Sequence, residues 1–334
     1  MRHILATDGQ GPRIREVCQR YIARHKVATR ARLGQKIASR WRPQKVSIIP
    51  DLRGWDGFGF IPLVADIADP VRTERVFSRH RPAVVFHAAA YKHVPMLEAH
   101  PEEAIIVNVW GTWHVCQFAS QYNCERFVLV STDKAVHPTS ILGFSKRLGE
   151  MIARAQEHSE TVHCSVRFGN VIASRGSALP EFVRQIDAGG PVTITHPEVK
   201  RYFMTIREAV SLVIQAAAMA EGSELFMLDM GESIKILDIV NRIIRMRGLR
   251  VGKDVHIMYT GLRPGEKLDE ELFSDSEKVC PTASPSIYSV VENVNPSLRD
   301  MEESVILLKS IATQGDPTAI RSTLIQTMMR MSVV

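Results

Sequence analysis

The sequence predicts an open, doubly wound parallel α/β sheet with a smaller C-terminal lobe. Apolar strand-like segments alternate with helical segments from about residue 60 to residue 167, as in parallel sheets with crossover helices. Several of these strands run directly into small or polar residues, and ligands bind at this carboxyl edge of such sheets. The chain has 334 residues, of which 45% are hydrophobic, so it can bury a large core.

Composition argues against several classes of protein. No stretch comes near the roughly 18 uninterrupted apolar residues of a membrane span. The start of the chain lacks the apolar core of a signal peptide, so we expect a cytoplasmic protein. The five cysteines are scattered and form no Cys-x-x-Cys pair, which predicts free thiols and no metal site.

The net charge of +6 is unevenly distributed along the chain. Residues 1–50 hold 12 basic and 2 acidic residues, whereas residues 51–334 hold 30 basic and 34 acidic residues. A basic end can bind nucleic acid or an acidic membrane surface. Because neither aromatic–basic interleaving nor zinc-finger spacing accompanies it, we expect no nucleic-acid partner.

The first segment matches a dinucleotide-binding turn incompletely. Residues 2–7 fit a first strand, and Gly9 and Gly11 follow where such a fold places its glycine-rich turn. A further glycine for helix packing is missing, and arginines follow instead. No acidic residue that could hold a ribose occurs between Glu16 and Asp51.

The alternation of strand and helix becomes regular after residue 57. We predict a short strand at residues 60–67, which ends in Asp66 and Ile67, and a helix at residues 70–80. A mostly apolar strand follows at residues 83–90.

Small and polar residues follow the strand at residues 83–90. Ala88 and Ala89 are small enough to let a dinucleotide backbone approach, and the polar loop 91–93 comes next. For this loop a purely solvated role is the alternative. The helix that begins at Pro101 carries Asn108 and Gly111, and we expect Gly111 to permit close packing.

The central stretch carries the chemistry. A buried strand at residues 127–130 leads into the turn 131–134, and a helix carrying Lys146 follows. Hydroxyls, the carboxylate of Asp133 and the amines of Lys134 and Lys146 form a set suited to proton transfer. The alternative is that Asp133 caps a turn and both lysines are solvated.

The C-terminal half predicts further strands and helices with polar residues between them. Arg201 stands beside aromatic residues, and a guanidinium suits a bidentate phosphate contact, although an exposed arginine is the alternative. Arg263 precedes a Pro-Gly turn. We predict strands at 162–167, 192–194, 225–231 and 255–259, and a helix that the segment 175–180 opens and that runs through residue 186. We also predict helices at 206–220 and 234–248 and a helical pair at 296–334.

Four motifs together resemble a known family. They are the segments 87–93, 131–136, 191–206 and 263–267. The chain from about residue 61 to residue 289 resembles the extended short-chain dehydrogenase/reductases, and within them the nucleotide-sugar 4,6-dehydratases of the CapD-like polysaccharide biosynthesis family. The resemblance implies a Rossmann-like NAD-binding domain at residues 1–165, of which residues 1–50 are atypical, and a nucleotide-sugar lobe with a returning strand at 166–290. For residues 291–334, about which the resemblance implies little, the sequence itself predicts a helical tail.

The resemblance also implies roles for individual residues. Asp133 would protonate the departing C6 hydroxyl, Lys134 with a lowered pKa would take the C5 proton, and Thr132 would contact the C4 oxygen. Lys146 would hold the nicotinamide ribose. The implied NAD contacts are Gly9, Gly11, Asp66, Ile67, Ala88, Ala89, Tyr91, Lys92, Asn108, Ser131 and Lys146. The implied contacts to a UDP-sugar are His93, Asn170, Arg201, Arg263 and Glu266.

The implied reaction is the 4,6-dehydration of a sugar like UDP-N-acetylglucosamine by a homo-oligomeric enzyme. Leu142 stands where relatives have Tyr or Met, so a tyrosine base is absent. The alternatives are a C4 epimerase or reductase, and an inactive remnant or nucleotide-sugar binder, which the incomplete glycine turn favours.

Residues 1–50 leave two explanations open. They belong to a divergent member of the family, or they are out of register with an ancestral reading frame, since family-like sequence returns abruptly after Asp51. A comparison of the coding DNA in all three frames would decide, and the absence of a glycine-rich reading would exclude the second explanation.

Overall fold

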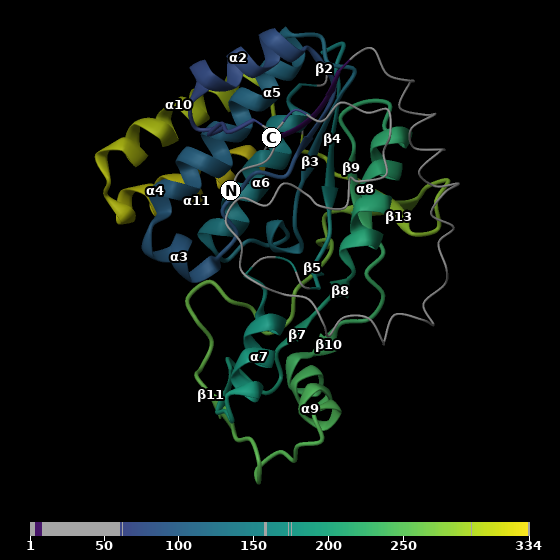
Figure 1. The fold of residues 1–334 in the computed structure, drawn as a ribbon. Helices are drawn as coiled ribbons and strands as arrows, with labels where there is room; N and C mark the ends of the chain where they lie inside the picture. The colour runs from purple at the N-terminus through teal and green to yellow at the C-terminus, as the bar shows by residue number, and fades with distance from the viewer. Residues whose placement is uncertain are drawn as a thin grey trace.

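A seven-stranded sheet forms the centre of the molecule, with strand order β1-β2-β3-β4-β9-β13-β12 (Figure 1). The computed structural model describes residues 4–8, 61, 63–156, 159–172, 174, 176–294 and 296–332. Strands β2, β3, β4 and β9 run parallel to one another. Strand β13 pairs antiparallel with β9, and β12 pairs antiparallel with β13. The strands are β1 Ile4–Asp8, β2 Pro82–His87, β3 Arg126–Val130, β4 Val162–Arg167, β9 Leu225–Leu228, β12 Lys278–Pro281 and β13 Ile287–Val291.

Two expectations about the first part of the sheet are wrong. Strand β1 lies where a strand was expected, but it pairs antiparallel with β2 at the edge of the sheet. An antiparallel edge strand on a parallel sheet is common, and local sequence does not encode pairing direction. The predicted strand at 60–67 is absent from its described residues, because Asp66 forms a turn instead. Its Oδ1 accepts from the Ala68 N–H at 2.9 Å, just before α2.

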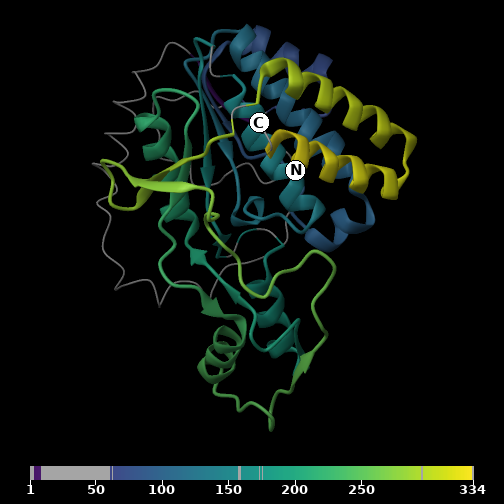
Figure 2. The ribbon, with the colours of Figure 1, turned by 180° about the vertical axis from the view of Figure 1, so that it is seen from behind.

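Helices cover both faces of the sheet (Figures 1 and 2). Alternate residues of β3 face different cores, because side chains alternate along a strand. Phe127 and Leu129 lie in a core with α5, α6 and the C-terminal helices, and Val128 lies in a core with α8. The helices are α2 Pro70–His80, α3 Val94–Ala99, α4 Pro101–Glu103, α5 Thr112–Gln121, α6 Ile141–Arg154, α8 Ile206–Met219, α10 Leu298–Gln314 and α11 Pro317–Ser332.

A π-helical segment, η2 Ala104–Gly111, joins α4 to α5. Gly111 permits the expected close approach, although to Ile67: a Cβ added there would lie 2.8 Å from the Ile67 Cδ1. None of the described helices is both long and apolar enough to cross a membrane.

A smaller lobe lies beyond the end of the sheet at which β4 ends (Figure 1). Its core is separate from the cores of the sheet and is built from α7 and α9 over short strands. From the region 166–290, β9, β13 and β12 all join the main sheet, where a single returning strand was expected. The lobe contains β6 Val192–Ile194, β7 Lys200–Arg201, β10 Ile234–Lys235, β11 Ile257–Tyr259, α7 Ala178–Asp187 and α9 Ile236–Met246, and β5 Asn170–Val171 pairs with β8 Phe203–Met204.

Candidate active site

The turn after β3 places a carboxylate in a fully buried position. Asp133 begins the short 3₁₀ helix η3 Asp133–Ala135, and its relative exposure is 0%. Its Oδ1 accepts hydrogen bonds from Thr132 Oγ1 at 2.9 Å and from Lys134 Nζ at 2.9 Å. Its Oδ2 is buried without a hydrogen-bond partner among the described residues. A buried carboxylate oxygen without a partner is costly, so its presence points to a functional group.

Glycines on two sides make room for this turn. The N-cap Ser140 accepts from the Gly143 N–H at 3.0 Å and starts α6 directly beneath the turn. A Cβ at Gly143 would lie 2.3 Å from the Lys134 carbonyl oxygen. A Cβ at Gly169 would lie 3.1 Å from Asp133 Oδ2. The backbone therefore comes close to the turn where a larger residue would displace it.

Lys134 lies between two carboxylates. Its Nζ is 2.9 Å from Asp133 Oδ1 and 3.3 Å from Glu270 Oε1. Burial alone would lower the pKa of Lys134, but Asp133 and Glu270 outweigh it and hold this pKa above its ordinary value. The expected lowered pKa of Lys134 is therefore wrong for this arrangement, because the sequence did not reveal the second carboxylate.

Lys146 is buried on α6, and its Nζ donates to the Val130 carbonyl oxygen at 2.6 Å. Burial lowers the pKa of Lys146 to about 8, although Glu150 opposes the shift. Leu142 is also buried, at 4% exposure, and offers no ionisable group. The described site thus has an amine at Lys146 whose pKa is lowered to about 8, and it has no tyrosine at position 142.

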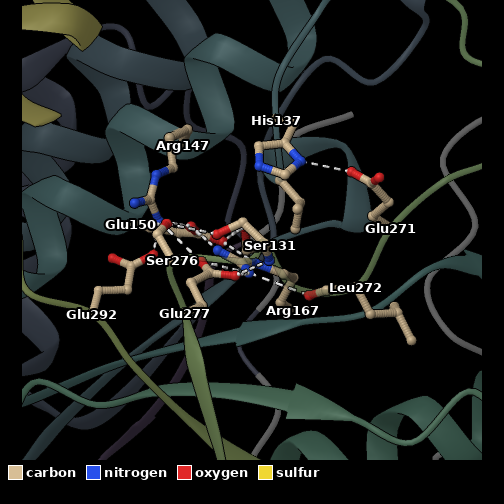
Figure 3. A network of polar contacts seen from close by, with 12 residues as sticks. Ser131, His137, Arg147, Glu150, Arg167, Glu271, Leu272, Ser276, Glu277 and Glu292 are labelled. Atoms are coloured by element: carbon tan, nitrogen blue, oxygen red, sulfur yellow. Dashed lines mark hydrogen bonds and ion pairs between the residues drawn. The ribbon is translucent and has the colours of Figure 1, made fainter.

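A buried ionic network lies directly behind the turn (Figure 3). The Ser131 hydroxyl donates to Glu150 Oε1 at 2.5 Å, and Arg167 Nη2 donates to Glu150 Oε2 at 2.8 Å. Arg167 Nη1 also donates to the carboxylate of Glu277 at 3.0 Å. Burial raises the pKa of Glu277 to about 7. The network joins the end of β3, α6 and β4 to the chain segment that precedes β12.

Six of the residues expected to contact NAD lie in the first part of the chain, before residue 90. Ala88 is exposed and Ala89 buried just beyond the end of β2, where they were expected. Asp66 forms a turn and Ile67 lies in the core, and a contact of either residue to NAD stays a prediction. Gly9 and Gly11, like the rest of the segment at 9–50, lie outside the described residues.

Asn108 holds the loop that follows β2. Its Oδ1 accepts from the Tyr91 N–H at 2.8 Å, and its Nδ2 donates to the Tyr91 carbonyl oxygen at 3.0 Å and to Ser145 Oγ at 3.0 Å. Lys92 Nζ donates to Ser174 Oγ at 3.2 Å. The Ser131 hydroxyl donates to Glu150, so the polar groups of Ser131 and Asn108 bind other protein groups in this structure.

Of the residues expected to contact a nucleotide sugar, Arg263 and Glu266 lie in the loop 261–272, and Arg201 binds the backbone of this loop. Its Nη1 donates to the Leu268 carbonyl oxygen at 3.1 Å, and its Nη2 donates to the Lys267 carbonyl oxygen at 2.9 Å. Arg201 therefore anchors this loop, and a phosphate contact by Arg201 stays a prediction.

The predicted turn is present at the tip of this loop. The Arg263 N–H donates to Glu266 Oε2 at 3.1 Å, and the Arg263 side chain is exposed. Thr139 Oγ1 donates to the Gly265 carbonyl oxygen at 3.2 Å, so the turn rests on the start of α6. Asn170 lies in β5, and its backbone N–H donates to the Tyr202 carbonyl oxygen at 3.0 Å, beside the pairing of β5 with β8.

His93 lies against a glycine. A Cβ at Gly176, where φ is +70°, would come within 2.5 Å of the His93 imidazole. The loop 91–93 therefore packs against Gly176 and Ser174, as the Lys92–Ser174 hydrogen bond also shows.

Sequence reasoning missed three functional candidates: Glu150, Arg167 and Glu270. Glu150 could have been found, because it follows Lys146 at the i, i+4 spacing of one helix face. Arg167 ends a strand, as polar site residues do, but nothing in its neighbourhood in the sequence indicates a buried pair. Glu270 follows the turn 263–267, and only the fold brings it to Lys134.

Parallel strands end at this buried turn, and the helix that follows carries a lysine, as the sequence resemblance to the extended short-chain dehydrogenase/reductases implied. The family model described as "Polysaccharide biosynthesis protein" matches residues 53–292. The chain belongs to this polysaccharide biosynthesis family.

Individual relatives agree with this assignment. The capsular polysaccharide biosynthesis protein CapD of Staphylococcus aureus is 48% identical over 220 residues, which cover 65% of this chain and 37% of CapD. A UDP-glucose 4-epimerase of Rickettsia canadensis is 39% identical over 198 residues, which cover 58% of this chain and 56% of the epimerase. The chain thus spans less than two thirds of the length of either relative. The X-ray structure of Pen from Bacillus thuringiensis has a TM-score of 0.64 and 32% identity, covering 70% of this chain and 72% of Pen.

Proposed function

We propose that this chain carries the active site of an NAD-dependent nucleotide-sugar 4,6-dehydratase acting on a substrate like UDP-N-acetylglucosamine. The observation that carries the proposal is the fully buried Asp133. Its Oδ2 has no partner among the described residues, while its Oδ1 accepts a hydrogen bond from Lys134 Nζ at 2.9 Å. A dehydration needs an acid for the departing hydroxyl and a base for the neighbouring carbon, and this pair provides both groups.

The described residues fit a dinucleotide at the ends of β2 and β3. Ala88 and Ala89 add little bulk there, and Lys146 Nζ has further N–H groups for a ribose besides the one donated to Val130. NAD bound there would supply the redox chemistry, by holding the hydride from C4 until it returns at C6. Micromolar or tighter binding of NAD⁺ by calorimetry is expected, and no binding at millimolar NAD⁺ would contradict the assignment.

The protein's own groups would carry the proton transfers. Thr132 would hydrogen-bond near the C4 oxygen, Lys134 would take the C5 proton, and Asp133 would give a proton to the C6 hydroxyl, which leaves as water. The structure contains Asp133 and Lys134 as an ion pair. One proton must therefore pass from Lys134 Nζ to the Asp133 carboxylate before elimination, and elimination restores the ion pair.

The acid assignment can be tested by substitution. Asp133→Asn removes the acid while keeping the shape, so turnover should fall by about 10²–10⁴-fold. The matched control is Asp187→Asn in the small lobe, where the carboxylate is 52% exposed and pairs with Arg247. Full turnover by Asp133→Asn would remove Asp133 from the mechanism.

A C4 epimerase is the second candidate, and its support is the similar Rickettsia epimerase. Leu142 cannot take the C4 hydroxyl proton, which both reactions must lose when C4 is oxidised, so this position does not separate the two candidates. The buried Asp133–Lys134 pair, which supplies the acid and base of an elimination, favours the dehydratase. An epimerase would return the hydride to C4 and lose no water, so product mass separates the two reactions. An inactive remnant would bind neither NAD⁺ nor the nucleotide sugar.

A further inference from the structure

Glu270 is a buried carboxylate beside the candidate site that neither the sequence motifs nor the proposed reaction uses. Its side chain is 3% exposed, and its Oε1 lies 3.3 Å from Lys134 Nζ. Its Oε2 is buried with no hydrogen-bond partner among the described residues. Because burying a carboxylate is costly, this one has to be stabilised by the charges around it.

The position of Glu270 is fixed from another part of the fold. Arg201 Nε lies 3.7 Å from Glu270 Oε1, and the other nitrogens of this guanidinium donate to the Lys267 and Leu268 carbonyl oxygens. Negatively and positively charged side chains therefore alternate in a chain of ion pairs from Asp133 through Lys134 and Glu270 to Arg201.

We propose that Glu270 is a positioning residue that holds the Lys134 ammonium opposite Asp133 and controls where the shared proton resides. The inference deepens the proposed dehydratase function and, as an account of turnover, rests on it. Transfer of the proton breaks an Nζ–H bond of Lys134 and forms an O–H bond on Asp133, while Glu270 stays ionised. Net charge is unchanged, and Glu270 favours the state in which the proton is on Lys134.

Few other charged groups face Lys134 in the described structure. Asp133 lies in the same turn as Lys134, Glu270 lies in the loop 261–272 and Arg201 lies in β7. The positive charge of Arg201 lowers the pKa of Lys134 and so favours its neutral amine. From α6, the uncharged Gly143 meets the Lys134 backbone. Together the carboxylates dominate over burial and over Arg201, in agreement with the raised pKa of Lys134.

The test follows the ionisation of Lys134 directly, in the ligand-free full chain. Protein containing ¹³Cε-lysine is titrated by NMR, and the Lys134 signal is assigned by its loss in Lys134→Arg. In Glu270→Gln the midpoint for Lys134 should move to lower pH, because a carboxylate that stabilises the ammonium has been removed. The control Glu271→Gln changes the neighbouring carboxylate, which is 51% exposed and pairs with His137, and should leave the midpoint in place.

Turnover gives a separate readout. The reactive pair carries one proton, so kcat/KM should fall at alkaline pH when Lys134 loses it, and this limb should move to lower pH in Glu270→Gln. A merely structural role would lower the rate without moving the limb. If Glu270→Gln does not fold, Glu270→Asp is the second variant, because it keeps the charge but holds it farther from Lys134 Nζ. The Lys134 midpoint and the alkaline limb should then move to lower pH by a smaller amount.

The outcomes separate the two proposals. A Lys134 midpoint that does not move in the variant tested overturns the role of Glu270, whether or not the protein dehydrates a sugar. A displaced midpoint without any turnover supports control of Lys134 by Glu270 and contradicts the proposed function.

Discussion

Single residues around the buried turn are constrained by space. Gly143 lies in α6, where alanine would ordinarily stabilise a helix by about 0.5–1 kcal/mol relative to glycine. Its absent Cβ would lie 2.3 Å from the Lys134 carbonyl oxygen, which is backbone and cannot rotate away. Steric overlap in a packed region costs about 1–3 kcal/mol, so the clash should outweigh the helix propensity.

We therefore predict that Gly143→Ala lowers both stability and turnover, because the turn that carries Asp133 and Lys134 is displaced. The net loss in the free energy of unfolding should be about 1–2 kcal/mol, measured by urea denaturation. Gly222→Ala is the matched control, since a Cβ there meets nothing within 4 Å. Equal effects of the two substitutions would show that the close approach does not matter.

Lys146 gives a pH-dependent prediction. The folded state holds the pKa of Lys146 at about 8, below the ordinary lysine value of 10.5, so the unfolded chain binds the proton more strongly between these values. Stability contributed through Lys146 therefore rises as pH increases from about 8 to about 10.5, and below about 8 the buried charge is a full cost.

Lys146→Met should therefore be more stable than the wild type at pH 7, by about 1–3 kcal/mol, while losing activity. The advantage should shrink at a pH of about 9.5, where wild-type Lys146 is largely neutral when folded. Urea denaturation at both pH values measures it, and Lys235→Met, at a 37% exposed lysine, is the control. An advantage that does not change with pH would contradict the assigned cost of burial.

At the scale of elements, the sequence predicted most helices and strands of residues 70–332. The helix at 70–80 matches α2, because Pro70 starts it and an apolar face repeats along it. The strand predicted at 60–67 is wrong for its described residues, because the turn formed by Asp66 prevails over strand propensity. Pairing direction for β1 also failed, because it depends on partners rather than on local sequence.

Arg167 links elements that the sequence could not connect. It is fully buried at the end of β4 and binds Glu150 of α6 and Glu277 of the segment before β12. Both carboxylates are far from Arg167 in sequence, and no motif relates them. This is the part of the site that required the fold.

We predict that Arg167→Met destabilises the protein by about 3–5 kcal/mol, because Glu150 and Glu277 would remain buried without their partner. The control is Arg184→Met on α7, whose side chain is 69% exposed and pairs with Glu181, and which should change stability by less than about 1 kcal/mol. Denaturant titration of both variants gives the comparison. A loss for Arg167→Met as small as for the control would mean that the network is well solvated.

For the whole molecule, the C-terminal helical pair is part of the main core. Val305 and Leu308 of α10 and Leu324 of α11 are buried in the same cluster as Leu129 of β3. Arg321 of α11 pairs with Glu98, whose Oε1 also accepts from the Ile141 N–H at the start of α6. The tail, about which the family resemblance implied little, therefore supports the helix that carries Lys146.

The candidate site is likewise a product of the whole fold. Sequence placed Thr132, Asp133, Lys134 and Lys146 together because they follow one strand and its next helix. It could not place Glu270 beside Lys134, or show that Arg201 binds the loop 261–272, since these contacts join distant segments. These long-range contacts also reversed the expected direction of the pKa shift of Lys134.

The most direct measurement of the central claim is the product formed from UDP-N-acetylglucosamine and NAD⁺ in D₂O, analysed by mass spectrometry and NMR. If Lys134 and Asp133 act as proposed, the product has lost one water and carries deuterium at C5, where solvent replaces the abstracted proton. A product of unchanged covalent composition, epimerised at C4 and without deuterium at C5, would contradict the dehydratase account and favour an epimerase.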